Sequence, residues 1–262
     1  MDSQEMYVEA WKQTADTIVE LVPTLTPEQV ATPTDLPGWD VHDVVAHLAH
    51  LEEVVNGEPE PATEIAVVAA SYTTTGVDER RDVPVADLVA SLEREVATRY
   101  AFLTSQRLDL TEPAPVTPGG VPWTWETLLR NRAVDLWVHE QDIRRAVDVP
   151  GSLGSLGAQV TTHTFAAGMG FVLGKKVQAE PGTVVRWLVE GAVPLTIELQ
   201  VGDDGRARRA AATTSADVTL DMTSETFAVL AAGRRTPDQV EVRYAGDGDL
   251  AARVLAAMTL TF

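Results

Sequence analysis

The segment at residues 124–147 contains no Gly or Pro, so it can form an uninterrupted helix of about six turns. Asp135, His139 and Asp142 occur in it at spacings of four and three, which places them within about 60° of one another on the helix surface. The same stripe carries apolar side chains, those of Leu128, Val138 and Ala146. Two carboxylates and an imidazole that face a core cost free energy unless they are paired or bind a cation. The segment therefore predicts a helix that supplies half of a metal site.

The overall charge excludes some classes of partner. The 262 residues include 39 acidic and 20 basic side chains, for a formal net charge of −19. Nucleic acids and anionic membrane surfaces both require a cationic surface, so we expect neither as a partner. The N-terminal residues lack a signal-peptide pattern, and no apolar run is long enough to span a bilayer. We therefore expect a cytoplasmic protein with a small-molecule ligand.

The absence of cysteine limits the chemistry further. Disulfides and thiolate metal ligands are excluded, and any thiol chemistry must use a thiol brought from outside the chain. There is also no Gly-x-Ser-x-Gly motif, and no Gly-rich loop follows a predicted strand in the form that binds phosphate.

The other half of the predicted site lies on a helix expected at about residues 41–56, which the turn at 36–40 precedes. His47 falls within the apolar arc of this helix, whereas His50 falls near its edge and His42 points away. A lone histidine on an apolar face is usually a hydrogen-bonded core residue. Because the other helix offers a carboxylate and an imidazole on its own inward stripe, metal binding becomes the favoured interpretation.

Two further amphipathic helices are predicted at about residues 4–22 and 85–105. Together with those at 41–56 and 124–147 they favour an antiparallel four-helix bundle with the polar site inside it. The Pro- and Gly-rich segment at 149–157 is the predicted domain boundary. The expected organisation is a helical domain, a linker with a connecting helix, and a second domain, at 1–150, 151–181 and 182–262.

The second domain has the alternating pattern of strands. Gly202 to Gly205 predict a hairpin turn, and helices are expected at about 158–173, 223–233 and 249–258. The pattern predicts a small, mostly antiparallel sheet with helices on one face, and therefore an α+β multidomain fold. The expected strands lie at 184–190, 195–201, 206–213, 218–222 and 240–244.

His47, Asp135 and His139 are a donor set common in catalytic zinc sites, in which three protein ligands leave a position for water or substrate. Asp142 would then orient an imidazole N–H or hold Arg132 or Arg145. An ordinary buried Asp paired with an Arg is an equally weighted alternative for Asp142.

Two motifs resemble a known family. The first is Leu-Pro-Gly-Trp-Asp-Val at 36–41 followed by Val-Val-Ala-His-Leu at 44–48, and the second is Val-His-Glu-Gln-Asp-Ile-Arg at 138–144. Together they resemble the mycothiol-dependent maleylpyruvate isomerases, a family of actinobacterial metalloenzymes. The resemblance implies a DinB-like metal-binding four-helix bundle followed by a small α+β domain similar to sterol-carrier proteins.

The resemblance also implies a metal, normally zinc, held by His47, Asp135 and His139. Asp135 departs from the best-known isomerases, which have a Glu there, so the metal would lie closer to that helix or be bound through water. Mycothiol would be the thiol cosubstrate. In an isomerisation it would add to a carbon–carbon double bond of the substrate, rotation about that bond would follow, and elimination would regenerate the thiol. In a transfer reaction the thiol would instead be transferred to another small electrophile. We expect a catalytic role for Asp142. The candidates for binding the substrate are Arg80 or Arg81 and Arg234 or Arg235. The protein is expected to be a monomer or homodimer.

Two alternatives remain open at this point. The chain could be a non-catalytic small-molecule or lipid-binding protein that uses the second domain, or the metal could be purely structural. A catalytic site keeps an exchangeable position and should bind thiols in a metal-dependent way, whereas a structural site is closed.

Overall fold

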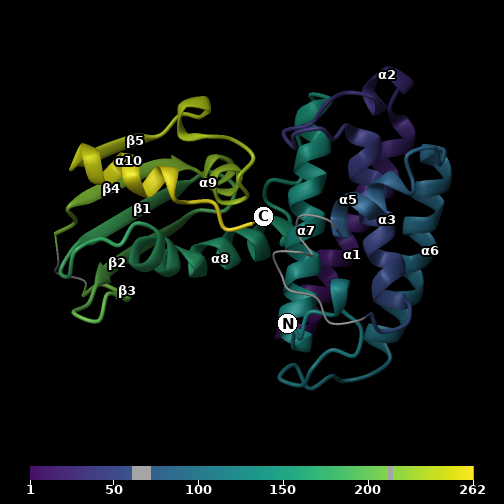
Figure 1. Ribbon diagram of the computed structural model, residues 1–262, viewed down its shortest axis with the longest axis horizontal. Coiled ribbons are helices and arrows are strands. Elements are labelled where there is room, and N and C mark those ends of the chain that lie inside the picture. The colour runs from purple at the N-terminus through teal and green to yellow at the C-terminus, as the bar shows by residue number, and fades with distance from the viewer. Residues whose placement is uncertain (61–71, 212–214, 262) are drawn as a thin grey trace. The chain divides into compact units, whose positions relative to one another are not determined.

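The computed structural model describes residues 1–60, 72–211 and 215–261. Its backbone divides into two compact units, Met1–Val160 and Thr161–Phe262. Among the described residues, the first unit is helical and the second combines helices with a five-stranded sheet (Figure 1). The predicted α+β fold, a helical domain followed by a small sheet domain, is confirmed.

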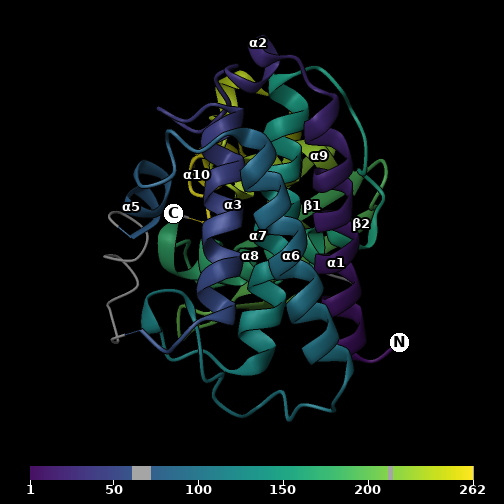
Figure 2. The same cartoon turned by 90° about the vertical axis from the view of Figure 1, so that its right-hand side faces the viewer.

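Four long helices build the first unit, as the periodicity of the sequence predicts. α1 packs against α6 and α7, and α3 packs against the same two helices, so the four enclose one core (Figure 2). Fully buried side chains in this core include Val44, Leu48, Leu92 and Leu128. The helices are α1 (Ser3–Leu21), α3 (Val41–Asn56), α6 (Val85–Thr104) and α7 (Trp125–Ala146).

The helices do not alternate in direction as expected for a simple antiparallel bundle. α1 and α6 are antiparallel, because Gln4 bonds the carbonyl of Leu103. α3 and α6 run parallel. His42, near the start of α3, contacts Val83, just before α6 begins, and Asn56, at the end of α3, contacts Glu95 farther along α6. The expectation of an antiparallel bundle is wrong at this pair. α3 and α6 therefore begin at the same end of the bundle.

Shorter elements connect the long helices. Thr26 and Gln29 form a capping box at the start of α2, with the Gln29 side chain accepting from the Thr26 N–H. The short elements of this unit are η1 (Val22–Thr24), α2 (Pro27–Val30), α5 (Thr73–Asp78) and the 3-10 turn η3 (Pro118–Gly120).

The two helices that carry the predicted site begin at capped ends. The Asp40 carboxylate accepts from the N–H of Asp43, and the Asp43 carboxylate accepts from the N–H of Asp40. The Thr124 hydroxyl accepts from the N–H of Thr127 at the start of α7. These bonds satisfy amide groups that have no partner inside a helix, so they fix where α3 and α7 begin.

The sheet of the second unit has the order β3-β2-β1-β4-β5. β1 and β4 are parallel, with Trp187 opposite Leu220, and the other neighbouring pairs are antiparallel. α9 and α10 pack on β4 and cover its buried side chains. The strands are β1 (Val184–Glu190), β2 (Leu195–Val201), β3 (Ala207–Arg209), β4 (Val218–Thr223) and β5 (Arg243–Gly246).

The remaining helical elements lie close to their expected positions. Thr223 caps α9, and Gly233 follows the helix at φ 66°, a conformation that favours glycine. These elements are α8 (Leu156–Phe171), the π turn η4 (Val172–Lys176), α9 (Ser224–Ala231), the 3-10 turn η5 (Pro237–Gln239) and α10 (Gly248–Ala256).

Two strand predictions need correction, both at edges of the sheet. β3 ends at Arg209 rather than extending to 213, and residues 212–214 lie outside the described part of the chain. β5 begins at Arg243 rather than at 240, and residues 240–242 connect the capped turn η5 to the strand. Edge strands have one neighbour and little buried surface, so alternation predicts their ends poorly. Among the described helices, none is both long and apolar enough to cross a membrane.

Candidate metal site

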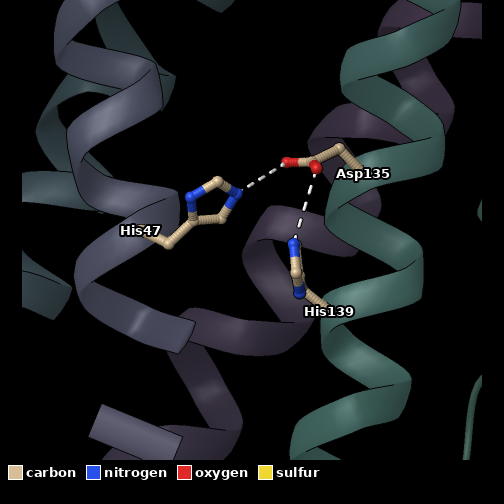
Figure 3. A group of neighbouring side chains, drawn as sticks. All are labelled: His47, Asp135 and His139. Carbon is tan, nitrogen blue, oxygen red and sulfur yellow. Dashed lines mark ion pairs between the residues drawn. The ribbon is translucent and has the colours of Figure 1, made fainter. Parts of the chain in front are cut away.

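The three predicted ligands come together in the first unit. His47 lies on α3, and Asp135 and His139 lie one turn apart on α7, so that all three face the space between the two helices (Figure 3). Each offers a ligand atom, and these atoms all lie within 4.8 Å of one another. The Nε2 atom of His47 is 3.6 Å from Oδ2 of Asp135, and that of His139 is 3.5 Å from Oδ1.

The two nitrogen–oxygen separations at Asp135 fit a small cation better than direct hydrogen bonds. At 3.5 and 3.6 Å the nitrogen–oxygen distances exceed those of normal N–H···O hydrogen bonds. Tetrahedral zinc, with bonds of about 2.0–2.1 Å, would place its donors roughly 3.3–3.4 Å apart. The buried Nδ1 of His47 has no hydrogen-bond partner among the described residues, and Nε2 is the ring nitrogen that faces Asp135. The fit to a metal therefore rests on the donor set and on the nitrogen–oxygen separations.

The site is enclosed but can be reached from outside. His47 and His139 are 4% and 5% exposed, whereas the Asp135 side chain is 29% exposed. Trp39, on the turn that leads into α3, lies 5.2 Å from the His47 ring and 6.4 Å from the His139 ring, measured between centroids. The indole therefore forms one wall of the site, and Asp135 lies where a small molecule could approach.

Asp142 fixes the orientation of His139. Its Oδ2 atom is 3.0 Å from Nδ1 of His139, and the carboxylate is fully buried. With Nδ1 held by a carboxylate, Nε2 is the nitrogen left to face Asp135. On its other side Asp142 accepts from Arg145 Nη2 at 2.6 Å, and Arg145 Nε donates to Asp35 at 2.7 Å. Asp142 thus makes both kinds of contact considered from the sequence, an imidazole and an arginine.

The pKa values differ between the two imidazoles. Burial lowers the pKa of His47 to about 4, although Asp135 acts in the opposite direction. Burial also lowers the pKa of His139, but the attraction of Asp135 and Asp142 outweighs it and the net shift is upward. Burial opposes the charge of Asp135, yet His139 and Arg132 hold the pKa of that carboxyl well below its usual range. At neutral pH, Asp135 is therefore an anion and His47 is neutral, the forms in which both bind metals.

Sequence reasoning missed two residues behind Asp135. Arg132 Nη1 donates to Oδ2 of Asp135 at 2.8 Å, and its Nη2 donates to Glu52 at 2.6 Å. Of the two arginines that the sequence offers to Asp142, Arg132 and Arg145, the structure pairs it with Arg145. The spacing of three between 132 and 135 could have indicated the first contact. No comparable local signal points to Glu52, which lies on the other helix.

The structure places the other candidate arginines in separate interactions. Arg80 pairs with Glu53 and donates to the carbonyl of Gly76, which ties α5 to α3. Arg81 pairs with Asp78 at 2.8 Å and lies 3.6 Å from Asp43. In the second unit, Arg234 donates to the carbonyl of Ala232, and Arg235 follows it in the chain. Substrate binding by these four arginines stays a prediction.

A second group of possible ligands has other roles. Asp40, His42 and Asp43 also place ligand atoms within 4.8 Å of one another. However, both carboxylates form the capping box of α3, and Nε2 of His42 lies 2.7 Å from the carbonyl of Val83. These contacts explain the proximity of the three side chains without a metal.

The fold and the site together define a two-unit α+β protein with two imidazoles and a carboxylate gathered between two bundle helices. The family model described as "Mycothiol maleylpyruvate isomerase N-terminal domain" matches residues 11–144, a segment that includes all three residues of the group. The chain belongs to this family, as the resemblance of its motifs predicted.

Solved structures agree with the family assignment at the level of the fold. A crystal structure of the mycothiol-dependent maleylpyruvate isomerase is similar with a TM-score of 0.60 and 16% sequence identity, covering 94% of this chain and 93% of that one. The structure of a histidine-to-alanine mutant of the isomerase gives a TM-score of 0.60 at 15% identity, with the same coverage. No curated protein gives a significant sequence match.

Proposed function

We propose that this protein is a metal-dependent enzyme that uses a low-molecular-weight thiol, mycothiol, to isomerise a small electrophilic substrate in the manner of maleylpyruvate isomerase. The observation that carries the proposal is the His47–Asp135–His139 group, which lies within the segment matched by the family model. Transfer of the thiol to another small electrophile is the closest variant of this function. In either case the thiol comes from outside, since the chain has no cysteine.

His47, Asp135 and His139 would hold the metal, for which we propose zinc, and Asp142 would position His139. Three protein ligands leave a position open at a four-coordinate metal, as in catalytic rather than closed structural sites. When bound, the metal would supply the positive charge that favours deprotonation of a thiol at neutral pH. The partial exposure of Asp135 supports access for a small molecule, while Trp39 would limit the entry of water.

Substrate carboxylates would require cationic partners, and Arg80, Arg81, Arg234 and Arg235 remain the candidates. Arg81 has the more exposed side chain of the first pair, at 56% against 18% for Arg80. Arg80 is also committed to Glu53 and to the carbonyl of Gly76. We therefore favour Arg81 over Arg80 within that pair.

The test begins with elemental analysis of protein purified without chelator or an affinity tag. We expect about one zinc per chain in the wild type, lost in His47→Ala, Asp135→Ala and His139→Ala. His42→Ala is the matched control, because it removes an imidazole from the same helix but leaves the group intact. The zinc protein should then catalyse cis-to-trans isomerisation of maleylpyruvate only when mycothiol is present.

The outcomes separate this function from its alternatives. Wild-type protein that binds no zinc even when zinc is added would contradict the proposal and favour a non-catalytic binding protein. If the protein binds zinc tightly but the spectrum of the cobalt-substituted protein does not change when a thiol is added, the metal would be structural. Zinc with thiol binding but no isomerisation would favour the transferase variant.

A further inference from the structure

Arg132 connects the candidate metal site to the interior of the bundle. It lies one turn before Asp135 on α7, is 4% exposed, and donates from Nη1 to Oδ2 of Asp135 at 2.8 Å. The other side of the same guanidinium faces Glu52 on α3, with Nε and Nη2 donating to Oε1 at 3.0 and 2.6 Å. One planar group therefore joins a candidate ligand to a second carboxylate.

Glu52, on α3, is held by side chains from two other helices. It is fully buried on α3, and its Oε1 atom accepts from the indole N–H of Trp11 on α1 at 3.0 Å as well as from Arg132 on α7. The chain of contacts runs from Trp11 through Glu52 and Arg132 to Asp135. Burying such an ion pair is expensive, and apolar replacements are often as stable, so its presence is weak evidence for a role in stability alone.

The geometry has two consequences for Asp135. Arg132 binds Oδ2 and turns Oδ1 toward Nε2 of His139, so the carboxylate has one defined orientation. Arg132 also brings a positive charge next to a cation site, which by itself would disfavour a metal. The Glu52 carboxylate offsets that charge through a contact of 2.6 Å, the shortest in the series from Trp11 to Asp135.

We infer that Arg132 is a positioning residue that orients Asp135 for metal binding, and that Glu52 is the buried counter-charge that makes this possible. The inference rests on the proposed metal-dependent function. It adds a requirement for metal binding beyond the three ligands, namely an intact ion pair between Arg132 and Glu52.

The test measures zinc affinity by competition with a chromogenic chelator, at a temperature where circular dichroism shows each variant to be folded. Glu52→Gln keeps the shape of the side chain but removes its negative charge, so that Arg132 keeps only the pairing with Asp135 among the two carboxylates. Arg132→Lys keeps the positive charge but cannot reach both carboxylates. We expect each to raise the Kd for zinc at least about tenfold, the usual effect of losing a residue that supports a metal ligand. The visible spectrum of the cobalt-substituted protein should change in both.

Glu140→Gln is the matched control. Glu140 is also fully buried and also pairs with an arginine, Arg144 Nε at 2.7 Å, on the same helix as two of the candidate ligands. It makes no described contact with the three ligands, so its loss should cost stability but leave the zinc Kd unchanged. If Glu52→Gln and Arg132→Lys fold poorly, Trp11→Phe removes the hydrogen bond to Glu52, together with part of a buried ring, and should raise the Kd for zinc about two- to threefold.

The possible results are distinct for the function and for the inference. Wild-type protein without zinc affinity would overturn the proposed function and the inference with it. If the wild-type protein binds zinc and the Glu52, Arg132 and Trp11 variants bind it as tightly as Glu140→Gln does, the inference would be overturned but the proposed function would stand. Weakened zinc binding and an altered cobalt spectrum in these variants, with Glu140→Gln unaffected, would support it.

Discussion

His47 and His139 face the same carboxylate but have different surroundings. The far nitrogen of His139 is held by Asp142, whereas the far nitrogen of His47 has no hydrogen-bond partner among the residues described. Burial therefore dominates at His47 and charge dominates at His139, and their pKa values move in opposite directions from 6.5.

These shifts predict separate titrations in the metal-free protein. His47 should stay neutral until the pH falls to about 4, while His139 should keep its proton above 6.5. Because the folded pKa of His47 is depressed, its contribution to stability is present above 6.5 and is lost as the pH falls through about 4. His139 acts oppositely, since its contribution is present below 6.5 and is lost as the pH rises through its raised pKa.

NMR titration of the imidazole signals, assigned with His47→Ala and His139→Ala, would measure both values. Titration of His47 and His139 at a common pH near 6.5 would contradict the burial and charge environments described here.

Among the secondary-structure elements, α3 depends most clearly on its N-terminal cap. Asp40 and Asp43 satisfy each other's amide groups at the start of the helix that carries His47. Replacing a capping Asp by Ala costs typically about 1 kcal/mol. Asp40→Ala should therefore lower the free energy of unfolding by about 1 kcal/mol, measured by urea denaturation.

Thr26→Ala is a suitable comparison for this variant. It removes the cap of α2, which has only four residues and no buried side chain, so its effect should be smaller. Equal effects of the two substitutions would mean that the cap of α3 contributes no more than that of a short surface turn.

At the scale of the whole molecule, acidic charge is concentrated in the first unit. Residues 1–160 contain 27 acidic and 10 basic side chains, so this unit carries most of the net charge of −19. Such an excess makes the folded unit repel itself, and a bound divalent cation would reduce the repulsion where α3 and α7 meet.

Zinc should therefore stabilise the protein by mass action. At a free zinc concentration about one hundred times the Kd, the expected gain is about 2.7 kcal/mol, provided that the unfolded chain does not bind the metal. Thermal unfolding with and without chelator, together with hydrogen exchange at α3 and α7, would measure the effect. His47→Ala should abolish it, and an equal gain in that variant would place the stabilising metal elsewhere.

The sequence alone determined the elements and the candidate ligands. Apolar periodicity and capping residues are local properties, so they predicted the four long helices, and they placed His47 on one inward face and Asp135 and His139 on another. Only the tertiary structure decided that α3 runs parallel to α6, that Glu52 meets Arg132, and that Trp39 covers the imidazoles. Each of these depends on which distant segments meet across the core. Spacing along one helix carries no information about such contacts, because the partner comes from a different part of the chain.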